Sequence, residues 1–298
     1  MDQAYSWLSA TLRLSTPLIF ACFAGLWSER AGVVDVGLEG KMLAGAFAGA
    51  AAASLTGDVR LGLLAAVAAS LALSFAQAWA EIERGGDQIV CGMAVNMIGA
   101  GLTAFAGAAL FGEGGRTPAL TAGERVTPVV AGLDALTLAA FAAAALSAFA
   151  LARTKLGLRV NAAGENPGAL DAAGGSVRAT RHIAVAIGGA LCGLAGADLS
   201  LAQAAGFLPG MSAGKGFIAL AALVFAKWRP GACLATCLLF GGLDAVAIRL
   251  PDAVVPGVGA VPVQALQALP YLLTVALLAG FVGRARPPAA AGQPYRRE

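Results

Sequence analysis

The glycine-rich stretch "GMSAGKGF" at 210–217 comes closest in this chain to a phosphate-binding loop. Such a loop needs two glycines five positions apart, then Lys, then a Ser or Thr hydroxyl for Mg²⁺. Here Gly210 and Gly214 are one residue too close, and Gly216 stands where the hydroxyl is required. The only histidine, His182, has no serine partner within an apolar run for nucleophilic catalysis. We therefore predict that the chain is not an enzyme and binds no cofactor itself.

Charged side chains gather in "SERAGVVDVGLEGK" at 28–41, between two long apolar runs: Glu29, Arg30, Asp35, Glu39 and Lys41. On a lipid-facing helix they would cost on the order of 15 kcal/mol, which excludes that arrangement. Two alternatives remain, a hydrated loop between spans or a broken segment whose charges face a protein-lined cavity. Glycines interrupt any helix here, while the neighbouring valines are unusual for an exposed loop, and this favours the broken segment.

The composition places these charges in a membrane protein. Of 298 residues, 58% are hydrophobic and 12% charged, about half the charged share of a soluble domain. Apolar runs of about 20 residues can each cross the hydrocarbon layer as a helix, and they lack the alternation of barrel strands. We expect an all-α polytopic membrane protein with about nine transmembrane helices, with eight or ten as alternatives. The runs lie at 7–27, 42–55, 61–80, 89–111, 135–152, 183–201, 216–226, 231–248 and 266–283.

Basic residues predict the orientation of this bundle. Lys and Arg gather in the connector 153–182 and again after residue 283, so both segments should be cytoplasmic. The spans between them have the right parity only if 216–226 also crosses. As a helix, that run rises only about 16 Å, so we expect a broken or re-entrant element there. Nine crossings place the N-terminus outside.

Small residues should bring the helices close together. The chain has 40 glycines, and helices in lipid associate through close packing. Gly45 and Gly49 form one small-xxx-small pair, and Gly189 and Gly193 form another. The five cysteines lie in apolar runs without a CxxC pair or a nearby histidine, so we expect packing residues and no metal site.

The connector contains "GENPGALDAAGG" at 164–175, which predicts a short helix. Asn166 is a favoured N-cap, Pro167 suits the first helical position, and Gly174 and Gly175 end the helix. A helix of two turns is marginal in water and needs a partner. It could lie on the membrane surface, but its small side chains suit close approach by another protein, and it lacks the aromatic and basic faces of an interfacial anchor.

Four blocks of the sequence resemble, in the same order, the membrane permeases of ABC importers for nucleosides. That family belongs to a larger group that carries simple sugars and branched-chain amino acids. The blocks are "SERAGVVDVGLEGKMLAGAF", "DQIVCGMAVNMIGAGLT", "GLRVNAAGENPGALDAAGGSVRATR" and "FLPGMSAGKGFIALAALVFAKWRPGACLATCLLFGGLDAVAIRL". The family pattern usually has Asn in place of Asp35, an apolar residue such as Met in place of Lys41, and a basic residue in place of Asn161.

The resemblance implies the permease bundle of a type II ABC importer, formed by one transmembrane domain at 1–286. The connector 153–182 would be its cytoplasmic coupling loop, and we expect the Pro/Ala-rich tail 287–298 to be disordered. The short helix would dock into a cleft of the ATP-hydrolysing subunit. The residues implied in this coupling are Gly164, Glu165, Asn166, Pro167, Leu170, Ala172 and Gly174.

The resemblance also implies partners and a location. An importer of this kind sits in the bacterial inner membrane and works with a separate ATPase subunit, which binds ATP-Mg. It pairs with a second permease subunit, more often a different chain than a copy, and receives solute from an extracytoplasmic binding protein. The lipid bilayer is its remaining partner, and no contact with nucleic acid is expected.

A nucleoside needs amide or carboxylate partners and an aromatic or methionine surface for its flat base. The residues that we expect along the substrate path are Asp35, Glu39, Met93, Asn96 and Phe217. Each has a structural alternative, since Asn96 could bond a neighbouring backbone carbonyl and Met93 could belong to the core. A simple sugar is the alternative substrate. An ion-coupled secondary transporter is the alternative class, because Glu39 could carry a proton.

Overall fold

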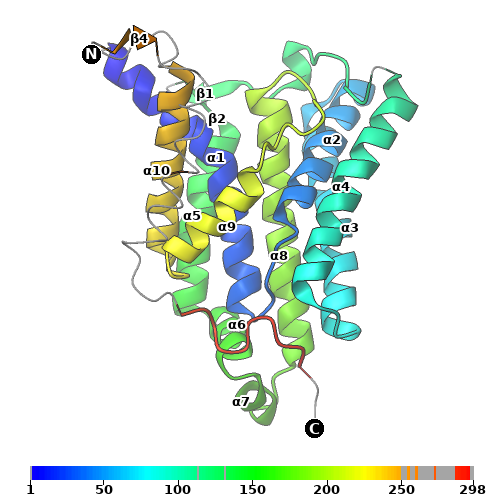
Figure 1. Cartoon of the computed structure of the whole chain (residues 1–298), viewed down its shortest axis with the longest axis vertical. Helices are drawn as coiled ribbons and strands as arrows, with labels where there is room; N and C mark the ends of the chain where they lie inside the picture. Colours follow the sequence, from blue (N-terminus) through cyan, green and yellow to red (C-terminus); the bar gives the residue numbers. More distant parts are fainter. Residues whose placement is uncertain are drawn as a thin grey trace.

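The computed structural model describes residues 2–112, 114–130, 132–249, 254–255, 259–260, 272 and 286–295. Figure 1 shows a bundle of long helices that run roughly side by side, with the N-terminus at one end and the C-terminus at the other. The helices are α1 (Asp2–Arg30), α2 (Leu38–Thr56), α3 (Val59–Ala78), α4 (Gln88–Phe111), α5 (Ala135–Arg153), α6 (Lys155–Glu165), α7 (Pro167–Ala172), α8 (Val177–Ala197), α9 (Lys215–Phe225) and α10 (Pro230–Arg249).

Shorter elements complete the described chain. Two π-helical turns, η1 (Trp79–Glu83) and η3 (Asp198–Gln203), extend α3 and α8, and η2 (Ala122–Glu124) is a 3₁₀ turn. The strands form two antiparallel pairs, β1 (Pro128–Val130) with β2 (Leu133–Asp134) and β3 (Val254–Val255) with β4 (Gly259–Ala260). These pairs are too short to form a core of their own.

The apolar runs of the sequence predict the helices well. Each of the first eight runs is helical in the structure, and the ninth, 266–283, lies outside the described residues. Within the described part, 6 helices are long and apolar enough to cross a membrane: Tyr5–Arg30, Val59–Glu83, Gln88–Phe111, Ala135–Arg153, Val177–Gln203 and Pro230–Ile248. The expected all-α polytopic membrane fold is therefore confirmed.

Polar caps fix where several helices begin. Asp58, Asp87, Asp134 and Ser176 each accept a hydrogen bond from a backbone N–H in the first turn of the helix that follows. These bonds satisfy donors that have no partner inside the helix. The sequence thus marks the starts of α3, α4, α5 and α8 by its few acidic and hydroxyl residues.

Helices α1 and α8 form the centre of the bundle. The middle of α1 is fully buried, with Phe20 and Phe23 enclosed by neighbouring helices. It packs against α5, α8, α9 and α10, while α2 packs against α3, α4 and α8. Two groups of helices therefore meet along α8.

Glycines allow the helices around α2 to approach closely. A Cβ atom added at Gly99 of α4 would lie 2.5 Å from the backbone oxygen of Gly40, and one added at Gly45 would lie 3.1 Å from Cα of Gly193. A Cβ atom added at Gly49 would lie 3.2 Å from Cβ of Ala66. The predicted small-residue contacts are thus present, and they place α2 against α3, α4 and α8 at backbone distance.

Gly99→Ala should destabilise the protein, because the added methyl group must push α4 away from the backbone of α2. We expect a loss of about 1–3 kcal/mol, the usual cost of overpacking. Gly101→Ala is the matched control in the same helix, since an added Cβ atom there meets nothing within 4 Å. Thermal unfolding in detergent measures both variants, and equal midpoints would contradict the close α2–α4 contact.

The described part of the C-terminal tail, for which disorder is expected from its composition, contacts the bundle. Residues 286–295 lie across the lower end of the bundle (Figure 1), where Ala290 N–H donates to the Gly164 carbonyl at 2.8 Å. Three prolines restrict the unfolded conformations of this tail and so lower the entropy that is lost on ordering it. Residues 296–298 lie outside the described part. The tail and the connector 153–182 are in contact, as expected if both lie on one side of the membrane.

Candidate translocation and coupling sites

Residues 31–37 link α1 to α2 as non-helical backbone, and most of them are buried in the bundle. Side chains of α4 bond the backbone of this link and of the first turn of α2: Val34 N–H donates to Oε1 of Gln88 (2.6 Å), and Gly40 N–H donates to Oδ1 of Asn96 (2.8 Å). The amide nitrogen of Asn96 donates to the Val36 carbonyl at 2.9 Å. Non-helical backbone at membrane depth is tolerated where protein groups satisfy it. The burial of residues 31–37 argues against the hydrated loop, the first of the two alternatives for 28–41.

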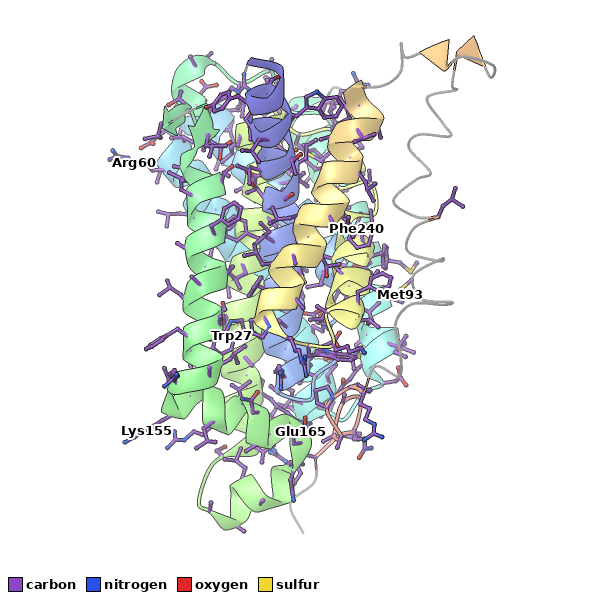
Figure 2. All side chains as sticks on the ribbon, turned by 90° about the vertical axis from the view of Figure 1, so that its left-hand side faces the viewer. Trp27, Arg60, Met93, Lys155, Glu165 and Phe240 are labelled. Carbon is purple, nitrogen blue, oxygen red and sulfur yellow. The ribbon has the colours of Figure 1, made fainter. Side chains whose placement is uncertain are left out.

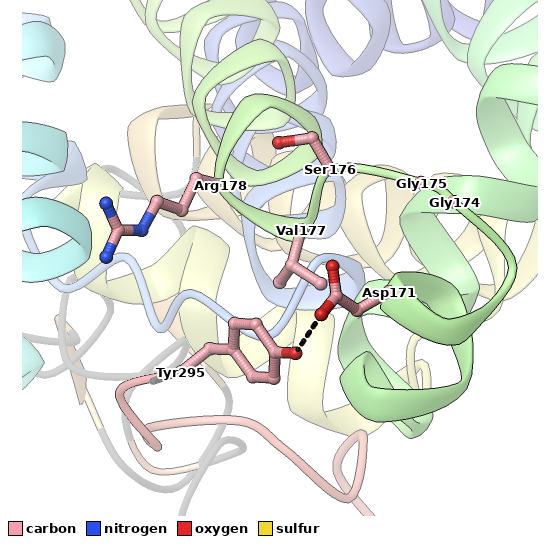
Figure 3. Close-up of a pocket in the computed structure, with 7 residues that line it drawn as sticks. All are labelled: Asp171, Gly174, Gly175, Ser176, Val177, Arg178 and Tyr295. Atoms are coloured by element: carbon pink, nitrogen blue, oxygen red, sulfur yellow. Dashed lines mark hydrogen bonds between the residues drawn. The ribbon is translucent and has the colours of Figure 1, made fainter. Parts of the chain in front are cut away.

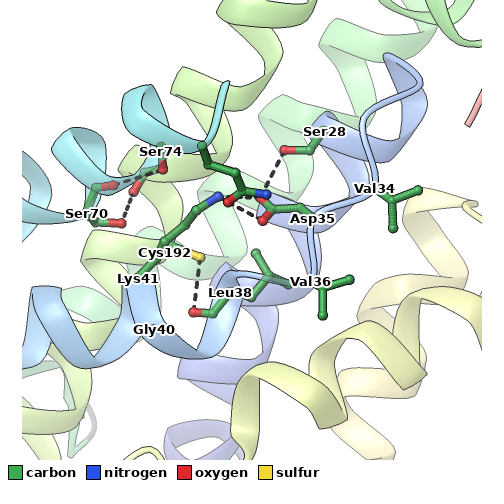
Figure 4. A network of polar contacts seen from close by, with 12 residues as sticks. Ser28, Val34, Asp35, Val36, Leu38, Gly40, Lys41, Ser70, Ser74 and Cys192 are labelled. Carbon is green, nitrogen blue, oxygen red and sulfur yellow. Dashed lines mark hydrogen bonds and ion pairs between the residues drawn. The ribbon is translucent and has the colours of Figure 1, made fainter. Parts of the chain in front are cut away.

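The charges of this break pair with each other inside the protein (Figure 4). Nζ of Lys41 lies 2.8 Å from both carboxylate oxygens of Asp35, and Ser28 Oγ donates to the same carboxylate at 3.3 Å. The Lys41 side chain is 0% exposed and that of Asp35 is 1% exposed. A buried charge is tolerated when it is paired and hydrogen-bonded. Asp35, expected along the substrate path, thus serves as an internal counter-ion.

The end of α1 is tied to the link between α9 and α10. Arg30 donates from Nε and Nη2 to the Trp228 carbonyl at 3.1 and 2.7 Å. Trp228 Nε1 donates to the buried Glu29 carboxylate at 2.6 Å. Trp228 has a positive φ of 55°, which is uncommon for a bulky residue and is held here by these bonds.

Glu39 caps the half-length helix α9. Its carboxylate accepts hydrogen bonds from Ser212 Oγ (2.6 Å), Gly214 N–H (2.8 Å) and Gly216 N–H (2.6 Å). A helix N-terminus that begins inside the bundle needs acceptors for its free N–H groups, and a carboxylate also favours the positive end of the helix dipole. Lys215, which lies between these two glycines, forms an ion pair with Asp244 at 3.1 Å. The expected broken element at 216–226 is α9, and the chain from η3 descends to its start (Figure 1).

Met93 and Phe217 lie beside these capped breaks and face out of the single chain. Their exposed fractions are 44% and 43%. Met93 follows Gly92, where an added Cβ atom would lie 2.9 Å from Cβ of Val36, and Phe217 follows the glycine that binds Glu39. Figure 2 shows Met93 at the side of the bundle. Both side chains are available to a solute or to another subunit.

The short helix α7 forms as the sequence predicts. Asn166 Oδ1 accepts from Ala169 N–H at 3.0 Å, and Pro167 occupies the first turn. Gly174 adopts a φ of 80°, and Gly175 N–H donates to the Leu170 carbonyl at 2.9 Å, which ends the helix.

The expected coupling residues divide into two sets. Leu170 is buried with Ala163 and Val177, and Gly164 is buried against the backbone of Arg30, so these residues anchor the loop to the bundle. The rest of the set is at least partly exposed at the tip: Glu165, Asn166, Pro167, Ala172 and Gly174.

Two functional contacts were missed by the sequence analysis. Gln88 was not singled out as a backbone partner of the break, and Arg181 was counted only as a basic residue of the connector. Arg181 is 2% exposed and donates to the Ala31 carbonyl at 3.1 Å. The available signal was an arginine directly before the apolar run 183–201, since a charged residue at the end of a span usually has a specific partner.

Interrupted helices whose ends are capped from within an all-α membrane bundle are typical of membrane transporters. Residues 7–283 match the family described as "Branched-chain amino acid transport system / permease component". This chain belongs to that family of ABC transporter permease subunits, and it is a multi-pass protein of the plasma membrane.

Several relatives match nearly over their full length. The guanosine ABC transporter permease NupQ of Bacillus subtilis is 36% identical over 96% of this chain and 95% of its own. The nucleoside ABC transporter permease NupC of Lactococcus lactis is 34% identical over 94% and 93%. TsgC13 of Haloferax volcanii, an ABC permease provisionally named for glucose, is 35% identical over 100% and 99%.

A solved transporter structure shows the same fold. A chain of an ABC transporter in an inward-facing conformation, provisionally described as of the metal-chelate type, aligns with a TM-score of 0.52, covering 92% of this chain and 84% of its own, at 17% identity. At that identity the likeness concerns the arrangement of helices alone.

Proposed function

We propose that this permease subunit forms half of a translocation path for nucleosides or related purines. The supporting observation is that Met93 and Phe217 are exposed next to the two chain breaks. A purine base offers a flat apolar face, which suits an aromatic and a methionine side chain. Relatives named for guanosine and nucleosides, at 36% and 34% identity, agree with this choice. The relative named for glucose makes a simple sugar the second candidate.

The polar groups at the breaks have a different task in this proposal. The Asn96 side chain forms hydrogen bonds with the backbone around the start of α2. The Glu39 carboxylate accepts hydrogen bonds from the backbone at the start of α9. They therefore shape the path and hold Phe217 in place, while direct contacts with the solute stay few and apolar. Weak contacts suit a permease, because a tightly held solute would be released slowly.

The proposed assembly consists of this chain and three kinds of partner. The exposed tip of α7 docks on a separate ATPase subunit, which binds ATP-Mg. A second permease subunit, either a different chain or a copy, faces Met93 and Phe217 across the path. An extracytoplasmic protein binds the solute tightly and delivers it to the outer end.

In proteoliposomes that contain this complex and its binding protein, guanosine or inosine should stimulate ATP hydrolysis. Phe217→Ala should weaken the response by about five- to 150-fold, since base stacking on an aromatic ring is worth roughly 1–3 kcal/mol. Phe149→Ala, which removes an exposed ring from α5, is the matched control and should respond like wild type. Stimulation by ribose with no response to guanosine or inosine would refute the nucleoside assignment.

A further inference from the structure

The C-terminal strap, residues 286–295, crosses the coupling loop. Ala290 N–H donates to the Gly164 carbonyl at 2.8 Å, at the end of α6. Ala289 N–H lies 3.4 Å from the Glu165 carboxylate, and Tyr295 OH donates to the Asp171 carboxylate at 3.1 Å (Figure 3). The strap thus contacts Gly164 and Glu165, which precede α7, and Asp171, which lies within α7.

The strap also leaves a pocket beside α7. The pocket has a volume of about 370 Å³ and is lined by Tyr295, Asp171, the turn 174–176 and the first two residues of α8. Figure 3 shows Tyr295 reaching from the strap to the end of α7, so its ring forms one wall. Any displacement of α7 must therefore move Tyr295 or break its hydrogen bond with Asp171.

Arg181 of α8 joins the strap to the first residues of the break. Its guanidinium donates from Nη1 to the Gln293 carbonyl at 3.0 Å and from Nε to the Ala31 carbonyl at 3.1 Å. Among the described residues it forms no ion pair with a carboxylate, although it is 2% exposed. Burying a cation against carbonyls alone costs free energy. A simple anchor for the tail would not need a charged group at this depth.

These contacts form one continuous chain from the tip to the broken segment. It runs from α7 through Tyr295 and Gln293 of the strap to Arg181, and from there to Ala31. Asp35 lies further along the same segment, and its ion-pair partner Lys41 lies at the start of α2. A continuous hydrogen-bonded connection of this kind can transmit a displacement between two arrangements of the bundle.

We propose that the C-terminal strap and Arg181 transmit movement of α7 to the break at 31–37, and so couple ATP hydrolysis to solute passage. Arg181 acts here as a positioning residue, because it touches neither solute nor nucleotide. The inference rests on the proposed docking of α7 on the ATPase subunit.

Removing residues 287–298 should uncouple the complex in proteoliposomes. We expect ATP hydrolysis to persist while the solute transported per ATP hydrolysed falls at least about fivefold, the lower range of an energetic coupling between sites. Arg181→Lys should give the same direction of change, because an ammonium group cannot span two carbonyls as a guanidinium fork does. Arg181→Lys keeps the positive charge, so it still tests the inference if the truncated chain assembles poorly.

Arg178→Lys is the matched control, since Arg178 lies on the same helix, is exposed and contacts Glu83 rather than the strap. It should leave the transport ratio unchanged. The inference would be overturned if the truncation and Arg181→Lys both left the solute transported per ATP hydrolysed unaltered. It would also be overturned if hydrolysis and transport fell in proportion.

A photoreactive residue in place of Ala169 separates this inference from the docking proposal. Crosslinking from position 169 to the ATPase subunit in an otherwise wild-type complex is the expected result, because Ala169 is exposed on α7. Absence of that crosslink would overturn the docking itself, and the strap inference with it. A crosslink together with an unaltered transport ratio would overturn the strap inference alone.

Discussion

Lys41→Met alone should strongly reduce the amount of folded permease in the membrane. The substitution leaves the Asp35 carboxylate buried at 1% exposure, with Ser28 as its one remaining hydrogen-bond partner in the part of the chain that the structure describes. Removing one member of a buried ion pair costs about 3–5 kcal/mol, which approaches the whole stability of many domains. Thermal unfolding of the detergent-solubilised protein and its steady-state level in membranes both measure the loss.

The double variant Asp35→Asn with Lys41→Met is the control, and it should recover most of the lost stability. It removes both charges together and places at these positions the residues that the family pattern usually has. Replacing a buried ion pair by well-packed neutral groups is often neutral or stabilising. A double variant as unstable as Lys41→Met, or a harmless Lys41→Met, would contradict the pairing of these two side chains.

The helices were predictable because membrane length and backbone satisfaction restrict the possible structures. The apolar runs set the positions of the long helices. Local chemistry set the boundaries of α7, where Asn166 caps the start and Gly174 adopts the positive φ that ends it. These features depend on residues that are close in sequence, so the sequence alone carries the information.

The roles of the polar residues depend on partners far away in the sequence. Asn96 bonds the backbone of Val36 and Gly40, and Glu39 binds the start of α9. Sequence analysis expected both along the substrate path, because intramembrane polar residues are usually functional. The sequence alone does not show which unpaired backbone groups lie next to Asn96 and Glu39. Met93 and Phe217 keep their expected role as a proposal, since both remain exposed beside the breaks.

The contacts of the C-terminal tail also depend on residues far away in the sequence. A Pro/Ala-rich end has no core of its own and reads as disordered. Its order comes from the Gly164 carbonyl and from Arg181, more than a hundred residues earlier in the chain. Neither partner is visible in the composition of 286–295.

Glu39→Ala should displace α9 and abolish uptake. The substitution leaves the N–H groups of Gly214 and Gly216 without the acceptor that the structure gives them inside the bundle. Each buried donor left unpaired costs about 1–3 kcal/mol, so the expected loss is on the order of 4 kcal/mol. Because Phe217 sits in the first turn of α9, a shift of this helix also moves the proposed solute contact. Uptake in proteoliposomes and the thermal midpoint in detergent measure the two effects.

Two further variants show whether the cap is the cause. Glu39→Gln retains one acceptor oxygen and should fall between wild type and Glu39→Ala. Asp244→Ala removes the partner of the neighbouring Lys215 at a partly exposed site, where an ion pair is worth about 1 kcal/mol or less. If Glu39→Ala proved no more harmful than Asp244→Ala, the start of α9 would have to be held by other contacts. A graded loss across the three variants would instead identify the carboxylate of Glu39 as the group that positions this half-helix.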